Sequence, residues 1–269
     1  MLKVGCQTYT WEMLGDGWKG KVDDMLDAVA GAGYEGIEIT NSMIREYAGR
    51  PREFAAALKH RGLKLSAFAY ASSAGLTKPE ARANELQGAD EAIRFVVEFP
   101  GVVLALGGAS TPERTDVDRK IGLAADFYNE VGERGKRAGV PVAFHPHSHH
   151  GSIFESRAEY QRIMELTDPA VVGWNPDTGH IVRGGQDLVD TIRTFGSRIN
   201  HVHLKDADSS NHWQRLGKGV CDIPTTLKVL EDELNYHGWV VGEEESEEAH
   251  RDQNAAIRNN REYLRSLGY

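Results

Sequence analysis

Short runs of apolar and β-branched residues recur along the chain, and stretches with the apolar spacing of helices separate them. Runs of this kind, bounded by turn residues, predict β-strands. We expect eight strands, over Lys3–Thr8, Gly36–Thr40, Lys64–Ala69, Val102–Leu106, Val140–His145, Val171–Asn175, Ile199–Lys205 and Trp239–Glu243. Eight is the number of parallel strands that closes a small barrel.

The stretches between the expected strands are amphipathic. Examples are VDDMLDAVAGAG at 22–33, PREFAAALKHRG at 51–62, the segment from Glu80 to Glu98, and ADFYNEVGERGKRAG at 125–139. Several of them end in glycine just before the next strand, and glycine accepts the left-handed backbone that stops a helix. Alternation of strands and helices predicts βαβ units and a parallel sheet.

Two α/β architectures fit this alternation, a closed barrel and an open doubly wound sheet. The open sheet usually carries GxGxxG after its first strand, and VGCQTYTWEM at 4–13 has no such motif. The chain has 269 residues, which is near the size of one barrel, and no linker or low-complexity tract divides it. We therefore predict an α/β protein, a single-domain (β/α)8 TIM-type barrel over residues 1–269.

Composition narrows the function classes. Hydrophobic residues make up 40% and charged residues 26%, as in a soluble protein with a real core. The formal net charge of −9 argues against nucleic acid and against an anionic membrane surface as partners. Cys6 and Cys221 are far apart, so we expect no disulfide and a reducing, cytoplasmic location. The N-terminal MLKVGCQTYTW leads into a strand pattern, and we expect neither a signal peptide nor a membrane span.

Polar residues collect at the ends of the last four expected strands, where barrel enzymes place their catalytic groups. Side chains two residues apart on a strand share a face, so the seventh and eighth strands each present several of these groups together. The residues are His145, His147, His149 and His150 in AFHPHSHH, Asp177 and His180 in GWNPDTGH, His201, His203, Lys205 and Asp206 in INHVHLKD, and Glu243 and Glu245 in WVVGEEES.

Histidine and carboxylate side chains from four successive strands can converge on one ion, and such nitrogen and oxygen ligands suit Mn²⁺, Zn²⁺, Co²⁺ or Fe²⁺. Each motif alone also has an ordinary structural explanation. DTGH, for example, could be a turn in which the aspartate caps a short helix. Their occurrence together at consecutive strand ends favours a shared metal site.

Weaker candidates lie at other strand ends and in later loops. The tryptophans among them either stack on a sugar or pack in the barrel, and the basic residues either hold a phosphate or carboxylate or are loop charges. They are Gln7, Tyr9, Trp11, Glu38, Trp213, Arg215 and Lys218.

With these residues established, the chain resembles the xylose-isomerase-like sugar isomerase/epimerase superfamily, which includes ketose 3-epimerases, hydroxypyruvate isomerase, endonuclease IV and inosose dehydratase. The resemblance spans essentially the whole chain. NPDTGHIVRGG at 175–185 is similar to the D-T-G-H strand end of the family, and INHVHLKD at 199–206 to its H-V-H-L-K-D segment. RLGKGVCDIPTTLKVL at 215–230 and HGWVVGEEES at 237–246 are similar to its glycine-bearing loop and last strand.

The resemblance implies that Asp177, His203 and Glu243 are metal ligands, and we expect His145 to be the fourth group at the metal. The fifth strand departs from the epimerases, which have a glutamate in a context like L-E-P where this chain has FHP at 144–146. The histidine-rich end of this strand is similar to the Y-H-H-H-type segment of inosose dehydratases. The closest resemblance is therefore to an inosose-dehydratase-like lyase.

That resemblance implies β-elimination from a keto-polyol or keto-sugar, of the inosose or 3-keto-glycoside type. A base removes the proton next to the ketone, a metal stabilises the enediolate, and an acid assists the leaving group. We expect Mn²⁺, with Co²⁺, Mg²⁺, Zn²⁺ or Fe²⁺ as alternatives. The acid and base groups are expected among His147, His180, Lys205 and Glu245.

Other functions stay open. The same metal would serve a ketose epimerase or an aldose–ketose isomerase, and a metal-bearing accessory subunit without turnover is a further alternative. A phosphodiesterase such as an abasic-site endonuclease would need several metals and a basic surface, which the charge of −9 opposes. The expected partner is a small keto-sugar or keto-inositol. Barrels of this type commonly pair, so a homodimer or higher homo-oligomer is an open expectation.

Overall fold

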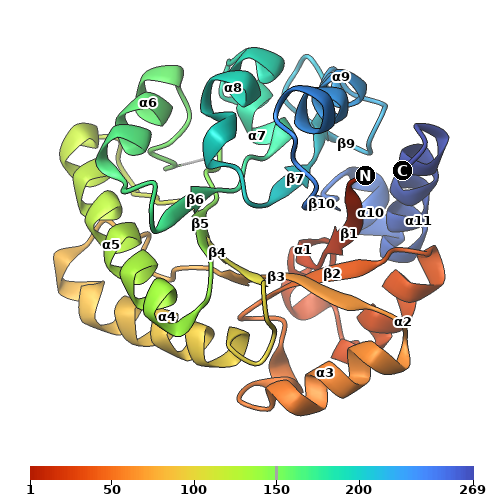
Figure 1. The fold of residues 1–269 in the computed structure, drawn as a ribbon. Coiled ribbons are helices and arrows are strands. Elements are labelled where there is room, and N and C mark those ends of the chain that lie inside the picture. The colour runs from red at the N-terminus through yellow and green to blue at the C-terminus, as the bar shows by residue number, and fades with distance from the viewer. Residues whose placement is uncertain (149–150) are drawn as a thin grey trace.

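The computed structural model describes residues 1–148 and 151–269. In these residues eight parallel strands form one sheet in the order β6-β5-β4-β3-β2-β1-β10-β7, which curls around a common axis (Figure 1). Isolated parallel bridges, Trp174 with Ile199 and Asp177 with His203, join the two edges. The strands are β1 (Lys3–Gln7), β2 (Gly36–Thr40), β3 (Lys64–Tyr70), β4 (Val103–Leu106), β5 (Val142–Phe144), β6 (Val172–Trp174), β7 (Val202–Leu204) and β10 (Trp239–Gly242). The predicted fold class, a (β/α)8 barrel, is confirmed.

Helices surround the strands on the outside of the barrel (Figure 1). None of the helices in 1–148 and 151–269 combines the length and the apolar character that crossing a bilayer requires. A short antiparallel pair, β8 (Asp206–Ala207) with β9 (Trp213–Gln214), follows β7. The helices are α1 (Tyr9–Glu12), α2 (Val22–Ala32), α3 (Pro51–His60), α4 (Arg82–Val96), α5 (Val117–Ala138), α6 (Arg157–Leu166), α7 (Thr178–Arg183), α8 (Leu188–Phe195), α9 (Ile223–Lys228), α10 (Glu247–Arg251) and α11 (Gln253–Ser266).

The glycine signals at helix ends act as predicted. α2 buries a face of apolar residues spaced three and four apart, and it stops at Gly33, whose φ is 80°. Gly62 after α3 and Gly139 after α5 also have positive φ, at 70° and 75°. This left-handed backbone strains residues with a Cβ atom, so each glycine ends its helix and turns the chain back toward the next strand.

Several predicted elements have different bounds. β5 and β7 are three residues each, shorter than the predicted Val140–His145 and Ile199–Lys205. The ladders stop short of the polar residues at the predicted strand ends. His145 and Lys205 therefore lie just beyond β5 and β7, and His201 lies just before β7. α5 starts eight residues earlier than the quoted 125–139 pattern, because Ile121 and Ala124 extend its buried face.

The interior of the barrel is polar where these strands end. On β2, Ile37 and Ile39 belong to the main hydrophobic core, whereas Glu38 between them reaches His201 and His203. Successive side chains of a strand point to opposite faces. On β2, therefore, one side of the strand packs in the hydrophobic core, and the opposite side directs Glu38 toward the two histidines.

Helix α5 packs against the segment of β5 through a glycine, Gly135. A Cβ atom on Gly135 would lie 2.5 Å from Val142 Cγ2 and 2.7 Å from the carbonyl oxygen of Val140. We expect Gly135→Ala to lower the free energy of unfolding by about 1–3 kcal/mol, as overpacking does. Gly122 lies in the same helix with no neighbour within 4 Å of its Cβ position. Gly122→Ala should instead raise stability by up to about 1 kcal/mol through helix propensity. Urea unfolding of the two variants measures the difference, and equal effects would contradict this packing argument.

Candidate metal centre

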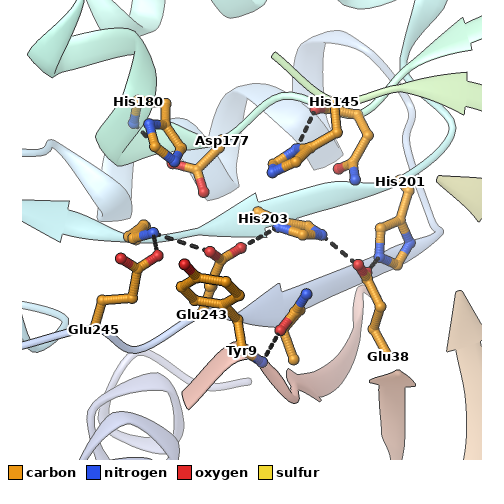
Figure 2. A network of polar contacts seen from close by, with 12 residues as sticks. Tyr9, Glu38, His145, Asp177, His180, His201, His203, Glu243 and Glu245 are labelled. Carbon is orange, nitrogen blue, oxygen red and sulfur yellow. Dashed lines mark hydrogen bonds and ion pairs between the residues drawn. The ribbon is translucent and has the colours of Figure 1, made fainter. Parts of the chain in front are cut away.

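Four buried side chains from four consecutive barrel strands meet at the C-terminal end of the barrel. His145, Asp177, His203 and Glu243 each offer a ligand atom, and these atoms all lie within 4.8 Å of one another. Figure 2 shows the four side chains directed toward a common space. They are the four residues predicted to surround the metal, and together they form a cluster that could hold a divalent ion.

Asp177 has one carboxylate oxygen committed to the fold and one left over. Oδ1 accepts a hydrogen bond of 2.8 Å from the backbone N–H of His180 and so caps α7. Oδ2 is buried and has no hydrogen-bond partner among the described residues. Burial raises the pKa of Asp177 to about 6. A buried carboxylate oxygen without a partner is costly, and a cation ligated there would remove that cost.

One ring nitrogen of each histidine in the cluster is bound by a group outside the cluster. His145 Nδ1 lies 3.1 Å from the carbonyl oxygen of Asn175, which can only accept, so Nδ1 carries the proton. His203 Nε2 lies 2.9 Å from Glu38 Oε2. Metal-ligating histidines usually donate their second N–H to a carbonyl or carboxylate in this way. The arrangement leaves His145 Nε2 and His203 Nδ1 as the nitrogens available to an ion.

The protonation of these histidines fits a site that attracts positive charge. Burial lowers the pKa of His145 to about 3, so its ring is neutral and able to act as a ligand. Burial also opposes a charge on His203, but Glu38 and Glu243 outweigh it and raise the His203 pKa to about 10. His203 Nδ1 lies 2.6 Å from Glu243 Oε2. A proton on His203 therefore balances carboxylates that a divalent ion would otherwise balance.

Lys205 connects the cluster to a further carboxylate. Its Nζ donates to Glu243 Oε1 at 2.9 Å and also to Glu245 Oε1. Burial opposes the charge of Lys205, but Glu243, Glu245 and Asp177 raise its pKa well above the ordinary value. Burial raises the pKa of Glu245 to about 7, despite the opposing effect of Lys205. A buried ammonium thus lies beside a carboxyl group that titrates near neutral pH.

His147 and His180 form a second pair of candidate acid/base groups. Their ring centroids lie 4.9 Å apart, and His147 is 4.6 Å from His145. The backbone N–H of Ser148 donates to His180 Nδ1 at 2.8 Å, which fixes the neutral tautomer with its proton on Nε2. Burial lowers the pKa of His180. The predicted His149 and His150 lie outside the described residues.

These groups face a cavity of about 240 Å³, below the typical range of roughly 300–1,000 Å³ for ligand pockets. Trp213 lines it, together with Gln7, Tyr9 and Glu38. Trp11, the other tryptophan considered as a sugar wall, is 3% exposed and packs in the core.

Sequence reasoning missed or underrated three contributors. Glu38 was only a weak candidate, yet its Oε2 also lies 2.6 Å from His201 Nε2. Glu38 therefore anchors both His203 in β7 and His201 just before it. The carbonyl of Asn175 has no sequence signal. Arg183 also lines the cavity, with its guanidinium 4.0 Å from the centroid of the Trp213 ring. Its spacing three residues after His180 on one helix face is a signal that could have found it.

The family model described as the xylose isomerase-like TIM barrel matches residues 26–267. The chain belongs to this family. The resemblance seen in the sequence is thus confirmed at the family level.

Relatives of this xylose isomerase-like barrel are distant in sequence. The inosose dehydratase of Mesomycoplasma hyopneumoniae (strain 7448) is 26% identical over 99% of this chain and 96% of that protein. The crystal structure of the IolI protein with a bound zinc atom superposes with a TM-score of 0.82 at 17% identity, covering 99% and 98%. The 3-keto-D-glucoside 4-epimerase of E. coli superposes with a TM-score of 0.78 at 19% identity, covering 99% and 100%. At these identities the two structures support the fold.

Proposed function

We propose that this protein is a divalent-metal-dependent carbon–oxygen lyase that acts on a keto-polyol or keto-sugar. The observation that carries the proposal is the four-ligand cluster at the C-terminal end of the barrel, flanked by two separate sets of acid/base groups. The likeness to an inosose dehydratase supports a sugar-modifying enzyme of this class. The cavity of about 240 Å³ supports a reacting unit of one small ring.

His145, Asp177, His203 and Glu243 would hold the ion, with Glu38 and the Asn175 carbonyl orienting the two histidines. Two imidazole nitrogens that carry no proton and two carboxylates suit Mn²⁺, and also Co²⁺, Zn²⁺ or Fe²⁺. The zinc atom bound by the IolI protein, which shares the fold, supports the use of a divalent ion. When bound, the ion would supply Lewis-acid polarisation of the substrate ketone.

The protein's own residues would move the protons. Glu245, with its pKa near 7, takes the proton from the carbon next to the ketone, and the ammonium of Lys205 stabilises the carboxylate before the transfer. The β carbon–oxygen bond then breaks, and the departing oxygen is protonated at the His147–His180 pair. His180 presents Nε2–H there because Ser148 holds its Nδ1. One proton leaves carbon and one reaches oxygen, so the products are an enone and water or an alcohol.

A ketose epimerase or aldose–ketose isomerase is the second candidate, because the same ion and the same base would begin that reaction. The fold likeness to a 3-keto-D-glucoside 4-epimerase favours it. The presence of His145 in place of a second β5 carboxylate opposes it, since epimerases of this kind use paired glutamates. The fate of the abstracted proton separates the two reactions.

The test is turnover in D₂O with Mn²⁺-loaded protein and a panel of keto-inositols and keto-sugars. We expect ultraviolet absorbance from an enone and a mass loss equal to water or an alcohol, both absent after chelation with EDTA. Elemental analysis of the purified protein identifies the ion beforehand. Deuterium in an epimer with no loss of water or alcohol would replace the lyase by the epimerase.

A further inference from the structure

A second hollow adjoins the cavity of the metal cluster. This outer groove has a volume of about 650 Å³ and is lined by the loop after β8, by β9 and by the start of α10. Arg183, Trp213 and Glu245 line both the cavity and the outer groove. The two hollows are therefore neighbours, and a molecule bound at the cluster can extend past Trp213 into the groove.

The wall of the outer groove is held in one shape by a buried carboxylate. Asp206 Oδ1 accepts hydrogen bonds from the backbone N–H groups of Ala207 at 2.9 Å and Cys221 at 3.0 Å. Its Oδ2 accepts from those of Gly217 and Gly219, both at 3.0 Å. Asp206 is 1% exposed. One side chain thus ties together both ends of the loop that carries the groove, so the groove is preformed.

Trp213 stands at the boundary between the two hollows with its position fixed. The backbone of Trp213 pairs with that of Ala207 in the β8–β9 ladder. Lys205 Nζ lies 4.1 Å and Arg183 Cζ 4.0 Å from the centroid of its ring. Trp213 is half-buried and its place is set by these neighbours, so it forms a fixed apolar wall shared by the cavity and the outer groove.

The charges in the outer groove are of both signs, and two pairs of them lie close together. Arg215 lies 3.7 Å from Glu248, and His212 lies 3.4 Å from Asp208. Asp208 also accepts a hydrogen bond from Gln214 Nε2 at 3.1 Å. A phosphate would call for converging guanidinium or ammonium groups in excess of carboxylates. The lining instead has three Lys or Arg side chains and four Asp or Glu side chains, namely Arg183, Arg215 and Lys218 against Asp208, Glu245, Glu247 and Glu248. Alternating donors and acceptors instead match neutral hydroxyl groups.

We propose that the outer groove binds a second, uncharged and hydroxylated part of the substrate, joined to the reacting keto ring. The substrate is then a keto-glycoside, with one ring at the metal cluster and a glycosyl or polyol group in the groove beyond Trp213. The cavity of about 240 Å³ leaves no room for both parts, whereas the two hollows together hold them. This substrate class rests on the proposed function for its chemistry, but the binding geometry is independent of it.

Calorimetry with Mn²⁺-loaded protein tests the groove, with each Kd taken before the ultraviolet absorbance of an enone appears. The probes are 3-keto-trehalose, which has two rings, and 3-keto-glucose, which has one. Lys218 is an exposed residue of the groove wall outside the cavity, and Lys218→Trp adds bulk to the groove. Lys228→Trp is the matched control, because Lys228 is exposed on α9 and does not line the groove.

We expect the two-ring probe to bind at least ten times more tightly than the one-ring probe. Lys218→Trp should abolish that difference and leave the one-ring Kd within twofold, whereas Lys228→Trp should change neither. Equal Kd values for the two probes, or an equal effect of Lys218→Trp on both, would overturn the proposal. Preferential two-ring binding with no enone from either probe would refute the proposed reaction and leave the groove standing. Enone formation with equal binding would do the reverse.

Discussion

Asp177→Asn is expected to abolish tight binding of the divalent ion and to lower kcat by about 10³-fold or more, because a metal Lewis acid contributes several kcal/mol to catalysis. The amide keeps an oxygen that can cap α7 as Oδ1 of Asp177 does at 2.8 Å from the His180 N–H. Asparagine caps helices about as well as aspartate. The change therefore removes charge at Oδ2, the buried oxygen without a partner, while the fold is retained.

Metal content by elemental analysis and kcat with added Mn²⁺ measure this effect. Asp187 provides the matched control, since its side chain caps α8 in the same way by accepting from the Asp190 N–H. Asp187→Asn should leave both metal content and kcat unchanged. A fully metallated and active Asp177→Asn enzyme would remove Asp177 from the ligand set.

Lys205→Met is expected to lower kcat by about 10²–10⁴-fold, the range that a positioned base contributes, because the base Glu245 loses the ammonium that keeps it ionised. The ammonium is 1% exposed and bound to both Glu243 and Glu245. Its loss leaves Glu245 without its counter-charge and leaves Glu243 with His203 alone, and breaking a buried ion pair costs about 3–5 kcal/mol. Part of the loss of activity could therefore come from unfolding, so kcat must be normalised to the folded fraction from circular dichroism.

Lys205→Arg separates the two effects. The guanidinium keeps the positive charge beside the carboxylates, so stability should recover in large part. Its planar fork cannot place a single donor where Nζ stands, 2.9 Å from Glu243 Oε1, so kcat should stay low. If Lys205→Arg restored most of the wild-type kcat, a positive charge beside Glu245 would be enough, and a single donor at the position of Nζ would not be required.

The barrel was predictable because its signals are local. Apolar runs, amphipathic spacing and stop glycines such as Gly33 and Gly139 each act within a few residues, and eight repeats of the same unit leave few topologies. Exact strand ends were less predictable. β5 and β7 stop after three residues because pairing with neighbouring strands, which the sequence does not encode locally, sets where a ladder ends.

The sequence by itself determined the identity of the cluster. His145, Asp177, His203 and Glu243 lie at successive strand ends, and parallel strands of a barrel bring those ends to one rim. Only the tertiary structure decided which groups form hydrogen bonds with the cluster. Glu38 comes from β2, 165 residues before His203, and the carbonyl of Asn175 bears no side-chain signal at all. Which oxygen of Asp177 lacks a partner, and which groove adjoins Trp213, depend on contacts between distant segments, and such contacts exist only once the barrel has closed.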